Sequence, residues 1–372
     1  MSTVGLNPEF WRGRRVFVTG HTGFIGSWFG LWLSQLGAEV TGYALPAPTD
    51  PSHFESIGLA NDLHSIIGDV RELSTLSGAM AAASPEIIVH LAAQPLVRRA
   101  FSEPVETFDT NVMGTANLLQ AARQSANVRA IVVMTTDKVY KNRNWAWGYR
   151  ENDRLGGTEP YGASKACAEH VVEAFRHSYF MDGEAPCGIA TVRAGNVIGG
   201  GDWAVDRIVP DAIKAFAAGE PLWMRNPDAV RPWQHVLEPI SGCLMLAERL
   251  IQDPEQFSSA WNLGPDEHEA RPVSWLVGEL ARCWGGPTQA MRDNRTGPQE
   301  AQLLMLSNAK AKAELGWHPV VSVEAALALS VEWYRRHLNK GDVRHLSIQQ
   351  IEAVMAARRT SAVTPLSVER QA

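Results

Sequence analysis

The stretch Arg15-Val-Phe-Val-Thr-Gly20-His-Thr-Gly23-Phe-Ile-Gly26 decides the fold of this chain. Its first five residues are mostly β-branched or apolar and run into a glycine, which is typical of a short buried strand. A helix is expected over residues 27–36, closed by Gly37, and a second strand over residues 38–43. A strand, a glycine turn, a helix and a strand within about 30 residues form one βαβ unit.

The glycines of this turn follow a Gly-x-x-Gly-x-x-Gly spacing at Gly20, Gly23 and Gly26. Glycines at such positions permit a tight turn, close approach of the backbone to a pyrophosphate, and close packing of helix on strand. A phosphate would lie at the N-terminus of the following helix. Glycines also occur in ordinary turns, but in this βαβ context the spacing predicts a nucleotide-binding site.

Strands and helices continue to alternate as far as Arg193. The expected strands are residues 65–70, 86–91, 130–135 and 188–193, and the expected helices are residues 109–123 and 161–176. This alternation predicts an α/β fold with a doubly wound parallel sheet of the Rossmann type. Ligands of such sheets bind at the carboxyl ends of the strands, where Gly20, Ala92, Thr136 and Arg193 stand. The sequence therefore predicts one shared site at that edge.

The pattern becomes less regular after Arg193. Helices are expected at residues 210–219 and 237–251, a strand end at 261–265, and two or three helices between 273 and 336. We expect a smaller, partly interleaved C-terminal domain that binds the substrate. The expected boundaries are 10–195 with 232–264 for the nucleotide-binding domain, 196–231 with 265–338 for the second domain, and 339–372 for a polar tail. The last ten residues or so are expected to be loose.

The composition of the 372 residues narrows the class of protein. A net charge of −6 shows no global basic excess, so no nucleic-acid partner is expected. The four cysteines lie far apart, which suggests neither a disulfide framework nor a zinc site and favours a reducing, cytoplasmic location. Neither a signal-peptide pattern nor an apolar run of about 18 residues is visible, so no membrane segment is expected. No metal is expected either.

A pair of reactive side chains stands in Tyr161-Gly-Ala-Ser-Lys165. Residues four apart leave the same face of a helix, so the phenol and the ammonium would be neighbours. A nearby cation favours the charged form of a phenol and makes it easier to deprotonate. Such a tyrosine can remove the proton from a sugar hydroxyl while a hydride leaves the same carbon. The pattern is weak alone, and Thr136-Asp137-Lys138 upstream strengthens it.

Further stretches extend this pattern along the chain. They are residues 18–26, 90–98, 110–115, 136–138, 147–151, 161–165, 193–203, 231–235 and 315–319. Together they resemble the extended short-chain dehydrogenase/reductase family, most closely its nucleotide-sugar 4,6-dehydratases and, among these, the branch that acts on CDP-glucose. The resemblance covers about residues 10 to 336. Relatives that act on dTDP-glucose or GDP-mannose carry a glutamate at the position of Lys138, whereas a lysine is associated with the CDP-glucose branch.

The resemblance implies a lyase that removes water from CDP-glucose without net redox, using NAD, and leaves CDP-4-keto-6-deoxyglucose for deoxysugar biosynthesis, such as that of lipopolysaccharide. Tyr161 would take the C4 hydroxyl proton, tuned by Lys165, while Thr136 would bond O4. Asp137 would be the acid at C6 and Lys138 the base at C5. The division of roles between Asp137 and Lys138 stays open, and Lys138 could instead be a surface or phosphate-binding lysine.

The resemblance also implies which residues contact the cofactor. They are Gly20, Thr22, Gly23, Phe24, Ile25, Gly26, Asp69, Val70, Leu91, Ala92, Ala93, Gln94, Asn111, Thr135, Tyr161 and Lys165. The chain departs from the usual pattern after the second strand, where Tyr43-Ala44-Leu45 replaces the acidic residue that often holds the ribose. NAD is favoured because the cycle regenerates its cofactor, and NADP stays an alternative.

The substrate contacts implied by the resemblance are Arg98, Asn196, Arg207 and Arg231. An arginine fork matches the geometry of a phosphate. His21, His90 and His235 are more often packed, hydrogen-bonded histidines than catalysts, so we leave them out of the chemistry.

The same residues are compatible with two alternative functions, and the resemblance also implies an oligomer. A C4 epimerase or ketoreductase of this family would need Tyr161 and Lys165 only, and a non-catalytic nucleotide-binding redox sensor would be expected to have lost them. The resemblance implies a homo-oligomer, a dimer or tetramer, formed through helices 109–123 and 161–176. The apolar residues considered for that contact, which could equally be ordinary core, are Val112, Leu119, Val171 and Phe175.

Overall fold

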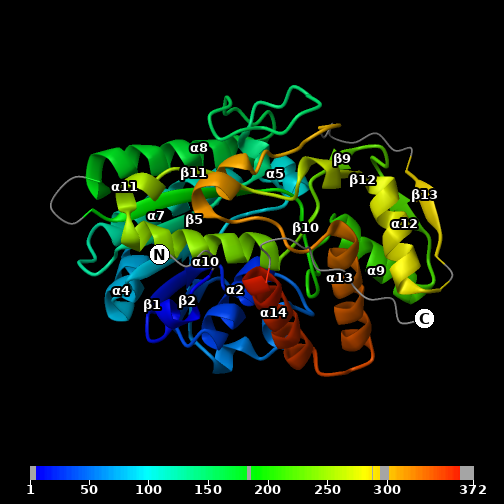
Figure 1. Cartoon of the computed structure of the whole chain (residues 1–372), viewed down its shortest axis with the longest axis horizontal. Helices are drawn as coiled ribbons and strands as arrows, with labels where there is room; N and C mark the ends of the chain where they lie inside the picture. The colour runs from blue at the N-terminus through cyan, green and yellow to red at the C-terminus, as the bar shows by residue number, and fades with distance from the viewer. Residues whose placement is uncertain (1–5, 182–185, 287, 294–300, 361–372) are drawn as a thin grey trace.

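A seven-stranded parallel sheet forms the centre of the protein (Figure 1). The structure is a computed structural model that describes residues 6–181, 186–286, 288–293 and 301–360. The strands are β1 (Arg15–Thr19), β2 (Glu39–Ala44), β3 (His64–Ile67), β4 (Ile87–His90), β5 (Ala130–Met134), β6 (Gly188–Ala194) and β11 (Ala260–Leu263). Their order is β11-β6-β5-β4-β1-β2-β3. This is the doubly wound order, extended by one strand, so the predicted fold class is confirmed.

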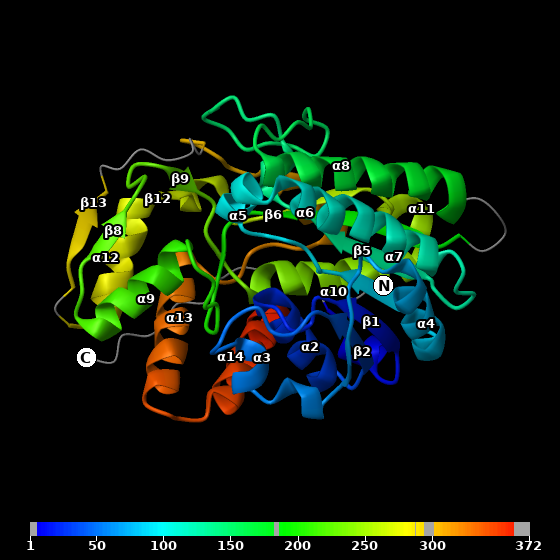
Figure 2. The same ribbon diagram turned by 180° about the vertical axis from the view of Figure 1, so that it is seen from behind.

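Helices cover both faces of this sheet (Figures 1 and 2). On one face lie α2 (Phe24–Gln35) and α10 (Leu237–Gln252), which share a core with Val16, Val18 and Val132. On the other face lie α4 (Leu73–Ala83), α7 (Gly114–Ala122) and α8 (Pro160–Phe175). Side chains alternate between the two faces of a strand, which explains why neighbouring β1 residues enter different cores.

The segments after β6 build a lobe beside the carboxyl ends of the strands, on the right in Figure 1. Its main elements are α9 (Ile208–Ala218), β8 (Leu222–Met224), α12 (Val273–Trp284), β13 (Ala290–Arg292) and α13 (Val323–Leu338). Two short strand pairs lie in these segments: β7 (Val197–Ile198) with β10 (Gln234–His235), and β9 (Val230–Arg231) with β12 (Arg271–Pro272). Within residues 232–264, β11 pairs with β6 and completes one edge of the central sheet.

The remaining helical elements are short. They are α1 (Pro8–Trp11), α3 (His53–Ser56), η1 (Leu59–Asn61), α5 (Val97–Ser102), α6 (Pro104–Phe108), η2 (Asp109–Met113), η3 (Asp137–Val139), η4 (Arg176–Phe180), α11 (Pro254–Phe257), η5 (Glu267–Glu269) and η6 (Ala311–Leu315).

The C-terminal segment differs from the polar tail that the sequence predicted. Residues Val343–Thr360 form α14, which lies beside α2 in both ribbon views (Figures 1 and 2). Its buried side includes Leu346, Ile351 and Val354, and Arg344 binds Asp62 through two N–O contacts of 2.7 and 2.9 Å. The looseness expected of the last ten residues falls outside the described part of the chain.

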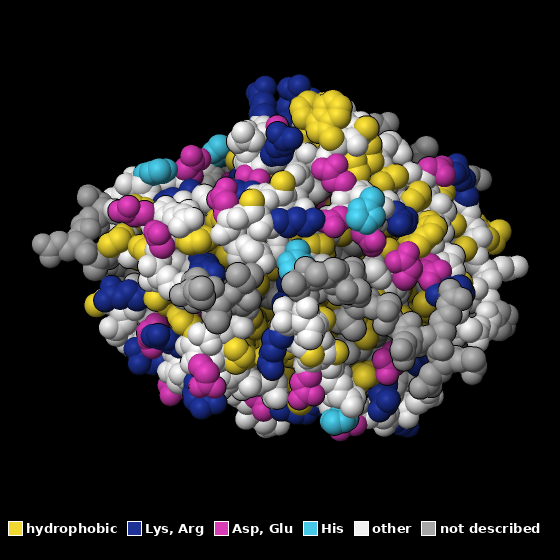
Figure 3. Space-filling view, viewed as in Figure 1, with side chains coloured by type: hydrophobic (Ala, Val, Ile, Leu, Met, Phe, Trp, Pro, Cys, Tyr) yellow, Lys and Arg dark blue, Asp and Glu magenta, His cyan; other side chains and the backbone are white. Residues whose placement is uncertain are grey.

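The surface carries mixed charges. On the face in Figure 3, basic and acidic side chains are interspersed, which differs from the single-sign stripe typical of nucleic-acid binding. Within the described residues, none of the helices combines the length and the apolar character needed to cross a membrane.

Candidate active site

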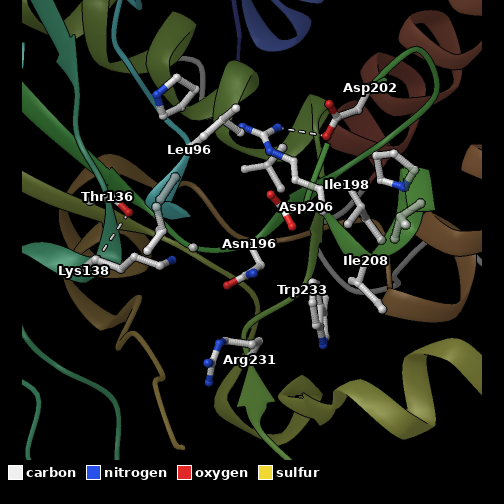
Figure 4. Close-up of a pocket in the computed structure, with 18 of the residues that line it drawn as sticks. Leu96, Thr136, Lys138, Asn196, Ile198, Asp202, Asp206, Ile208, Arg231 and Trp233 are labelled. Atoms are coloured by element: carbon white, nitrogen blue, oxygen red, sulfur yellow. Dashed lines mark hydrogen bonds and ion pairs between the residues drawn. The ribbon is translucent and has the colours of Figure 1, made fainter. Parts of the chain in front are cut away.

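A cavity of about 290 Å³ lies at the carboxyl ends of β5 and β6, between the sheet and the lobe (Figure 4). It brings together residues from six separate stretches of the sequence analysis: 18–26, 90–98, 136–138, 161–165, 193–203 and 231–235. The predicted site residues that line it are Ile25, Arg98, Thr135, Thr136, Lys138, Tyr161, Asn196, Arg207 and Arg231. The shared position expected for the catalytic and substrate-contacting residues is therefore present in the fold.

Thr136, Asp137 and Lys138 form a compact group directly after β5. Thr136 caps η3 by accepting a bond from the Lys138 amide at 3.4 Å. Asp137 is fully buried, and its Oδ1 accepts from Thr136 Oγ1 at 3.1 Å and from Lys138 Nζ at 3.3 Å. Its Oδ2 has no hydrogen-bond partner. These three side chains can hold a proton and pass it along the hydrogen bonds that join them.

Asp137 itself does not line the cavity, although both of its neighbours do. The wall beside it is Gly195, where an added Cβ would lie 3.2 Å from Asp137 Oδ2. Glycine at this position therefore lets the backbone of the cavity wall lie close to the buried carboxyl group.

Tyr161 lies in the first turn of α8, where the helix start is firmly held. Glu159 accepts bonds from the amides of Tyr161 and Gly162 at 2.7 and 2.6 Å. Burial raises the pKa of Tyr161 to about 12, while Thr136 and Arg207 act to lower it. The lowered phenol pKa predicted from the sequence is thus not found, because burial outweighs the effects of Thr136 and Arg207.

Lys165 follows one turn later and is also buried. Its Nζ donates to the carbonyl of Met134 at 3.1 Å. Burial lowers the pKa of Lys165 to about 8, and the carboxylate of Glu169 opposes this shift. Lys165 thus sits behind β5 rather than in the cavity wall.

A buried ion pair between Arg193 and Glu169 lies one helical turn from Lys165. Arg193 binds both carboxylate oxygens of Glu169, at 3.0 and 2.8 Å, and Thr135 and Thr191 donate to the same carboxylate at 2.6 and 2.7 Å. Burial raises the pKa of the Glu169 carboxyl group, but Arg193 and the two threonine hydroxyls lower it by more. The pKa of Glu169 therefore lies below its usual value. The sequence analysis missed Glu169, although Lys165 and Glu169 stand at the i,i+4 spacing of a helical ion pair.

The glycine turn fits a dinucleotide phosphate. Gly20 has φ +78°, and an added Cβ would lie 2.7 Å from the amide nitrogen of Ala92. A Cβ at Gly26 would lie 2.0 Å from the Gly20 carbonyl. At Gly23 a Cβ would meet only an ordinary contact at 3.4 Å, so packing does not explain that glycine. Gly23 is the N-cap of α2 and supplies no side-chain cap, which leaves the first amides of Phe24 and Ile25 for an anion.

Several predicted cofactor residues are bonded within the protein instead. Thr22 donates to the carbonyl of Leu45 at 2.8 Å, and Thr135 donates to Glu169. Asp69 follows β3 and accepts from Arg71 Nε at 2.9 Å, which lowers the pKa of the Asp69 carboxyl group.

Asn111 joins the loop after β4 to α8. Its Oδ1 accepts from the amide of Gln94 at 2.8 Å, and its Nδ2 donates to Ser164 Oγ at 2.9 Å. The Gln94 side chain donates to Thr107 Oγ1 at 2.8 Å. These groups hold the walls of the nucleotide site. The other predicted wall residues are Val70, which is buried after β3, and Leu91, Ala92 and Ala93, which follow β4.

Three predicted substrate residues, Asn196, Arg207 and Arg231, line the cavity from the segments after β6, whereas Arg98 lines it from α5 (Figure 4). Arg207 pairs with Asp202 at 2.8 Å, and Arg98 pairs with Asp206 at 3.4 Å. Asn196 Oδ1 is buried without a hydrogen-bond partner. Arg231 is 5% exposed and donates to the Val230 carbonyl at 2.9 Å.

Three charged residues that line the cavity were missed by the sequence analysis: Asp202, Asp206 and Arg225. They lie in loops whose shape follows no local pattern.

The three histidines set aside from the chemistry are core residues. Burial lowers the pKa of His21 to about 4 and of His90 and His235 to about 3. His90 lies between Thr19 and Thr115, at 2.7 and 3.2 Å. These rings are therefore neutral packing groups. In the part of the chain that the structure describes, no cluster of three His, Cys, Asp or Glu side chains is suited to a metal ion.

Comparison with known proteins gives consistent matches. The sequence model for GDP-mannose 4,6 dehydratase matches residues 17–329. A CDP-glucose 4,6-dehydratase of Salmonella typhimurium strain LT2 is 46% identical over 355 residues, covering 95% of this chain and 99% of the relative. A dTDP-glucose 4,6-dehydratase of Xanthomonas campestris pv. campestris strain B100 is 26% identical, covering 85% and 92%.

A solved structure agrees with these sequence matches. MoeE5 in complex with UDP-glucose and NAD is 27% identical with a TM-score of 0.72, and the likeness covers 87% of this chain and 99% of MoeE5. The resemblance inferred from the motifs is thus confirmed, and the chain belongs to the GDP-mannose 4,6-dehydratase family.

Proposed function

We propose that this protein is a CDP-glucose 4,6-dehydratase, a hydro-lyase that converts CDP-glucose to CDP-4-keto-6-deoxyglucose and water. The 46% identity to the Salmonella enzyme across both chains supports the substrate. The observation that carries the reaction type is the meeting of Thr136, Lys138 and Tyr161 in one cavity wall, with the Asp137 carboxyl group beside them.

NAD is the cofactor that the glycine turn and the first turn of α2 would hold, and bound NAD supplies hydride acceptance at sugar C4 and hydride return at C6. Phe24 and Ile25, in the first turn of α2, offer backbone amides to its diphosphate. On α8, Tyr161 lines the cavity, and Lys165 lies behind it with its Nζ bonded to the Met134 carbonyl at 3.1 Å.

Tyr161 takes the proton of the C4 hydroxyl as the first step. Because its pKa is about 12 in the chain alone, the phenol acts as a base only while positive charge lies next to it. Thr136 is placed to donate its hydroxyl hydrogen to O4, which stabilises charge on the forming ketone.

Lys138 and Asp137 carry out the elimination. The C4 ketone acidifies the C5 hydrogen, Lys138 removes it, and Asp137 gives a proton to the C6 hydroxyl, which leaves as water. As hydride enters C6, the Lys138 ammonium gives its proton back to C5. The proton that Tyr161 took from the C4 hydroxyl then restores the Asp137 acid by way of Thr136, whose hydroxyl contacts Asp137 Oδ1 at 3.1 Å.

The two parts of the chain divide this work. Residues 10–195 with 232–264 carry the cofactor and the chemistry, and residues 196–231 with 265–338 hold the nucleotide sugar through Asn196, Arg207 and Arg231. All four cysteines are free, which fits a reducing compartment such as the cytoplasm.

A homo-oligomer would form through the outer side of α6, η2 and α8. Val105 is 81% exposed and Met113 is 51% exposed on that side, and exposed apolar residues of this size favour a contact. Leu119, considered for this contact from the sequence, is fully buried core. Val105→Glu should shift the assembly toward monomer in light-scattering measurements.

An assay with four nucleotide sugars tests the function. Purified protein with NAD is incubated separately with CDP-, dTDP- and UDP-glucose and with GDP-mannose, and the 4-keto product is detected by its alkaline absorbance. Loss of water from CDP-glucose alone supports the proposal. Turnover of another sugar alone rejects it, and formation of a C4 epimer without the 4-keto absorbance identifies an epimerase instead.

A further inference from the structure

Two arginines converge on one carboxylate inside the cavity. Asp206 Oδ1 lies 2.8 Å from Arg225 Nη1 and 3.4 Å from Arg98 Nη1. Arg225 Nη2 also donates to the backbone carbonyl of Asp206 at 3.1 Å. All three residues line the cavity, and Figure 4 shows the Asp206 carboxylate between Asn196 and Asp202.

The two guanidinium groups come from opposite sides of the cavity. Arg98 lies on α5 in the sheet body, whereas Arg225 follows β8 in the lobe. Two planar guanidinium groups facing one point are the arrangement that a phosphate needs, because each can donate two parallel bonds to oxygen atoms. The shared Asp206 oxygen therefore marks an anion-binding position.

Asp206 is an unexpected residue at such a position. A fixed carboxylate would repel the diphosphate of a nucleotide sugar. Asp206 also has φ +62°, a left-handed conformation that is uncommon outside glycine and that clusters at functional sites.

The other aspartate of this loop has a different environment. Asp202 is 4% exposed, and its carboxylate accepts from Arg207 at 2.8 Å and from the amide of Ala204 at 3.2 Å, while its backbone carbonyl accepts from the hydroxyl of Tyr334. The Asp206 side chain is 39% exposed, and its ion pairs are with Arg98 and Arg225, whose side chains are 43% and 30% exposed. Exposed ion pairs of this kind are weak, so another anion can replace the carboxylate.

We propose that Arg98 and Arg225 form a diphosphate subsite of the cavity, and that Asp206 fills this subsite as an internal anion until the substrate displaces it. The inference rests on the proposed function only in requiring a nucleotide diphosphate as ligand. It assigns Arg225 to substrate binding and makes Asp206 a competitor of the substrate rather than a contact.

The test is equilibrium binding of CDP to the full chain loaded with NAD, measured by calorimetry. Asp206→Asn removes the charge, and asparagine tolerates the left-handed backbone. We expect its dissociation constant for CDP to fall about threefold or more, because the competing anion is gone. Arg225→Gln should raise that constant about tenfold or more. Cytidine, which has no phosphate, should bind both variants as it binds the wild type.

A matched control is Asp228→Asn, which removes the partner of Arg292, a 2.5 Å pair of exposed residues that do not line the cavity. It should leave CDP binding unchanged. Unchanged or weaker CDP binding by Asp206→Asn overturns the proposal, because Asp206 would then position the arginines or do nothing. Unchanged CDP binding by Arg225→Gln overturns it as well. Thermal unfolding midpoints close to wild type show that each variant is folded.

The same variants separate this inference from the proposed function. CDP, UDP, dTDP and GDP share the diphosphate, so the experiment is repeated with whichever nucleotide the wild type binds most tightly. Failure to dehydrate CDP-glucose rejects the function while the Asp206 effect can still be read. A wild-type chain that binds none of the four nucleotides overturns both.

Discussion

The two sides of the cavity are built differently. On the chemical side, Tyr161 and Lys165 lie on a capped helix and are less than 10% exposed. On the nucleotide side, Arg98 and Arg225 extend from a short helix and a loop and are 43% and 30% exposed. Reacting groups gain from being fixed before the substrate arrives, because reorganisation then adds nothing to the barrier. By contrast, a charged side chain that binds a charged ligand must first release the partner with which it is paired in the free protein.

The same difference separates two arginine–carboxylate pairs. Arg193 and Glu169 are 5% and 4% exposed, and the Glu169 carboxylate accepts two bonds from Arg193 and two from threonine hydroxyls. The Arg225 and Asp206 side chains are 30% and 39% exposed. Breaking a buried pair leaves an uncompensated charge, at about 3–5 kcal/mol. An exposed pair contributes about 0–1 kcal/mol. One pair is part of the scaffold and the other can be exchanged.

The largest expected effect is at Tyr161. Tyr161→Phe should lower kcat by about 10⁴-fold, because the base for C4 oxidation is lost, with CDP binding unchanged. Tyr179→Phe, at a 47% exposed tyrosine just beyond the same helix, is the control and should keep full activity. Activity within tenfold of wild type in Tyr161→Phe would show that another group takes the proton.

The largest expected loss of stability comes from removing the buried carboxylate of Glu169. Glu169→Gln leaves Arg193 charged and unpaired, so we expect unfolding to become easier by about 3–5 kcal/mol in a urea titration. Glu173→Gln, an exposed position on the same helix, should change little. A loss below about 1 kcal/mol in Glu169→Gln would place this pair with the exchangeable ones.

The effect of Glu169→Gln also depends on pH. The folded-state pKa of Glu169 is lowered, so its contribution is present above the unfolded value of about 4.3 and is lost as pH falls through the folded value. The stability difference between wild type and variant should therefore be constant at neutral pH and shrink below about pH 4.

Variants of Lys138 and Asp137 test which of the two residues is the base at C5 and which is the acid at C6. Each of Lys138→Gln and Asp137→Asn should slow dehydration about 10²-fold or more. In deuterated water, Asp137→Asn should still exchange the C5 hydrogen, whereas Lys138→Gln should not, as followed by mass spectrometry of recovered sugar. The opposite pattern would exchange the roles of the two residues.

The smallest effect is expected at the exposed pair on α14. Arg344→Met removes the pair with Asp62, whose side chains are 35% and 21% exposed, and should cost about 1 kcal/mol or less in urea unfolding. A loss as large as that of Glu169→Gln would mean that exposure does not separate the two kinds of pair.

The sheet and the chemical side were predictable because their signals are local. β1 and its glycine turn show their pattern within 12 residues, and Tyr161 and Lys165 are neighbours on one helix. Asp206 could not be predicted as a partner of Arg98 and Arg225, because a loop brings together three residues from distant parts of the chain. The same reason applies to Glu169 on α8, whose partner Arg193 lies on strand β6.

The C-terminal helix was missed for a different reason. Its buried residues Val343, Leu346, Ile351 and Val354 do recur with a helical period, but the segment is polar overall and this weak stripe was overlooked. The helix packs on α13, which precedes it, and on α2, more than 300 residues earlier in the chain, and local patterning gives no hint of the contact with α2.

The packing of α14 on α2 has a consequence for how this enzyme is made. The helix that begins at Phe24 is among the first to leave the ribosome, and the one that covers it ends at Thr360. At typical rates of synthesis the interval is roughly 20 to 60 s, during which the nascent nucleotide-binding half keeps part of its apolar surface in water. A message cut short before α14 would yield a chain with a near-complete sheet and an uncovered flank, a natural target for chaperones and proteases.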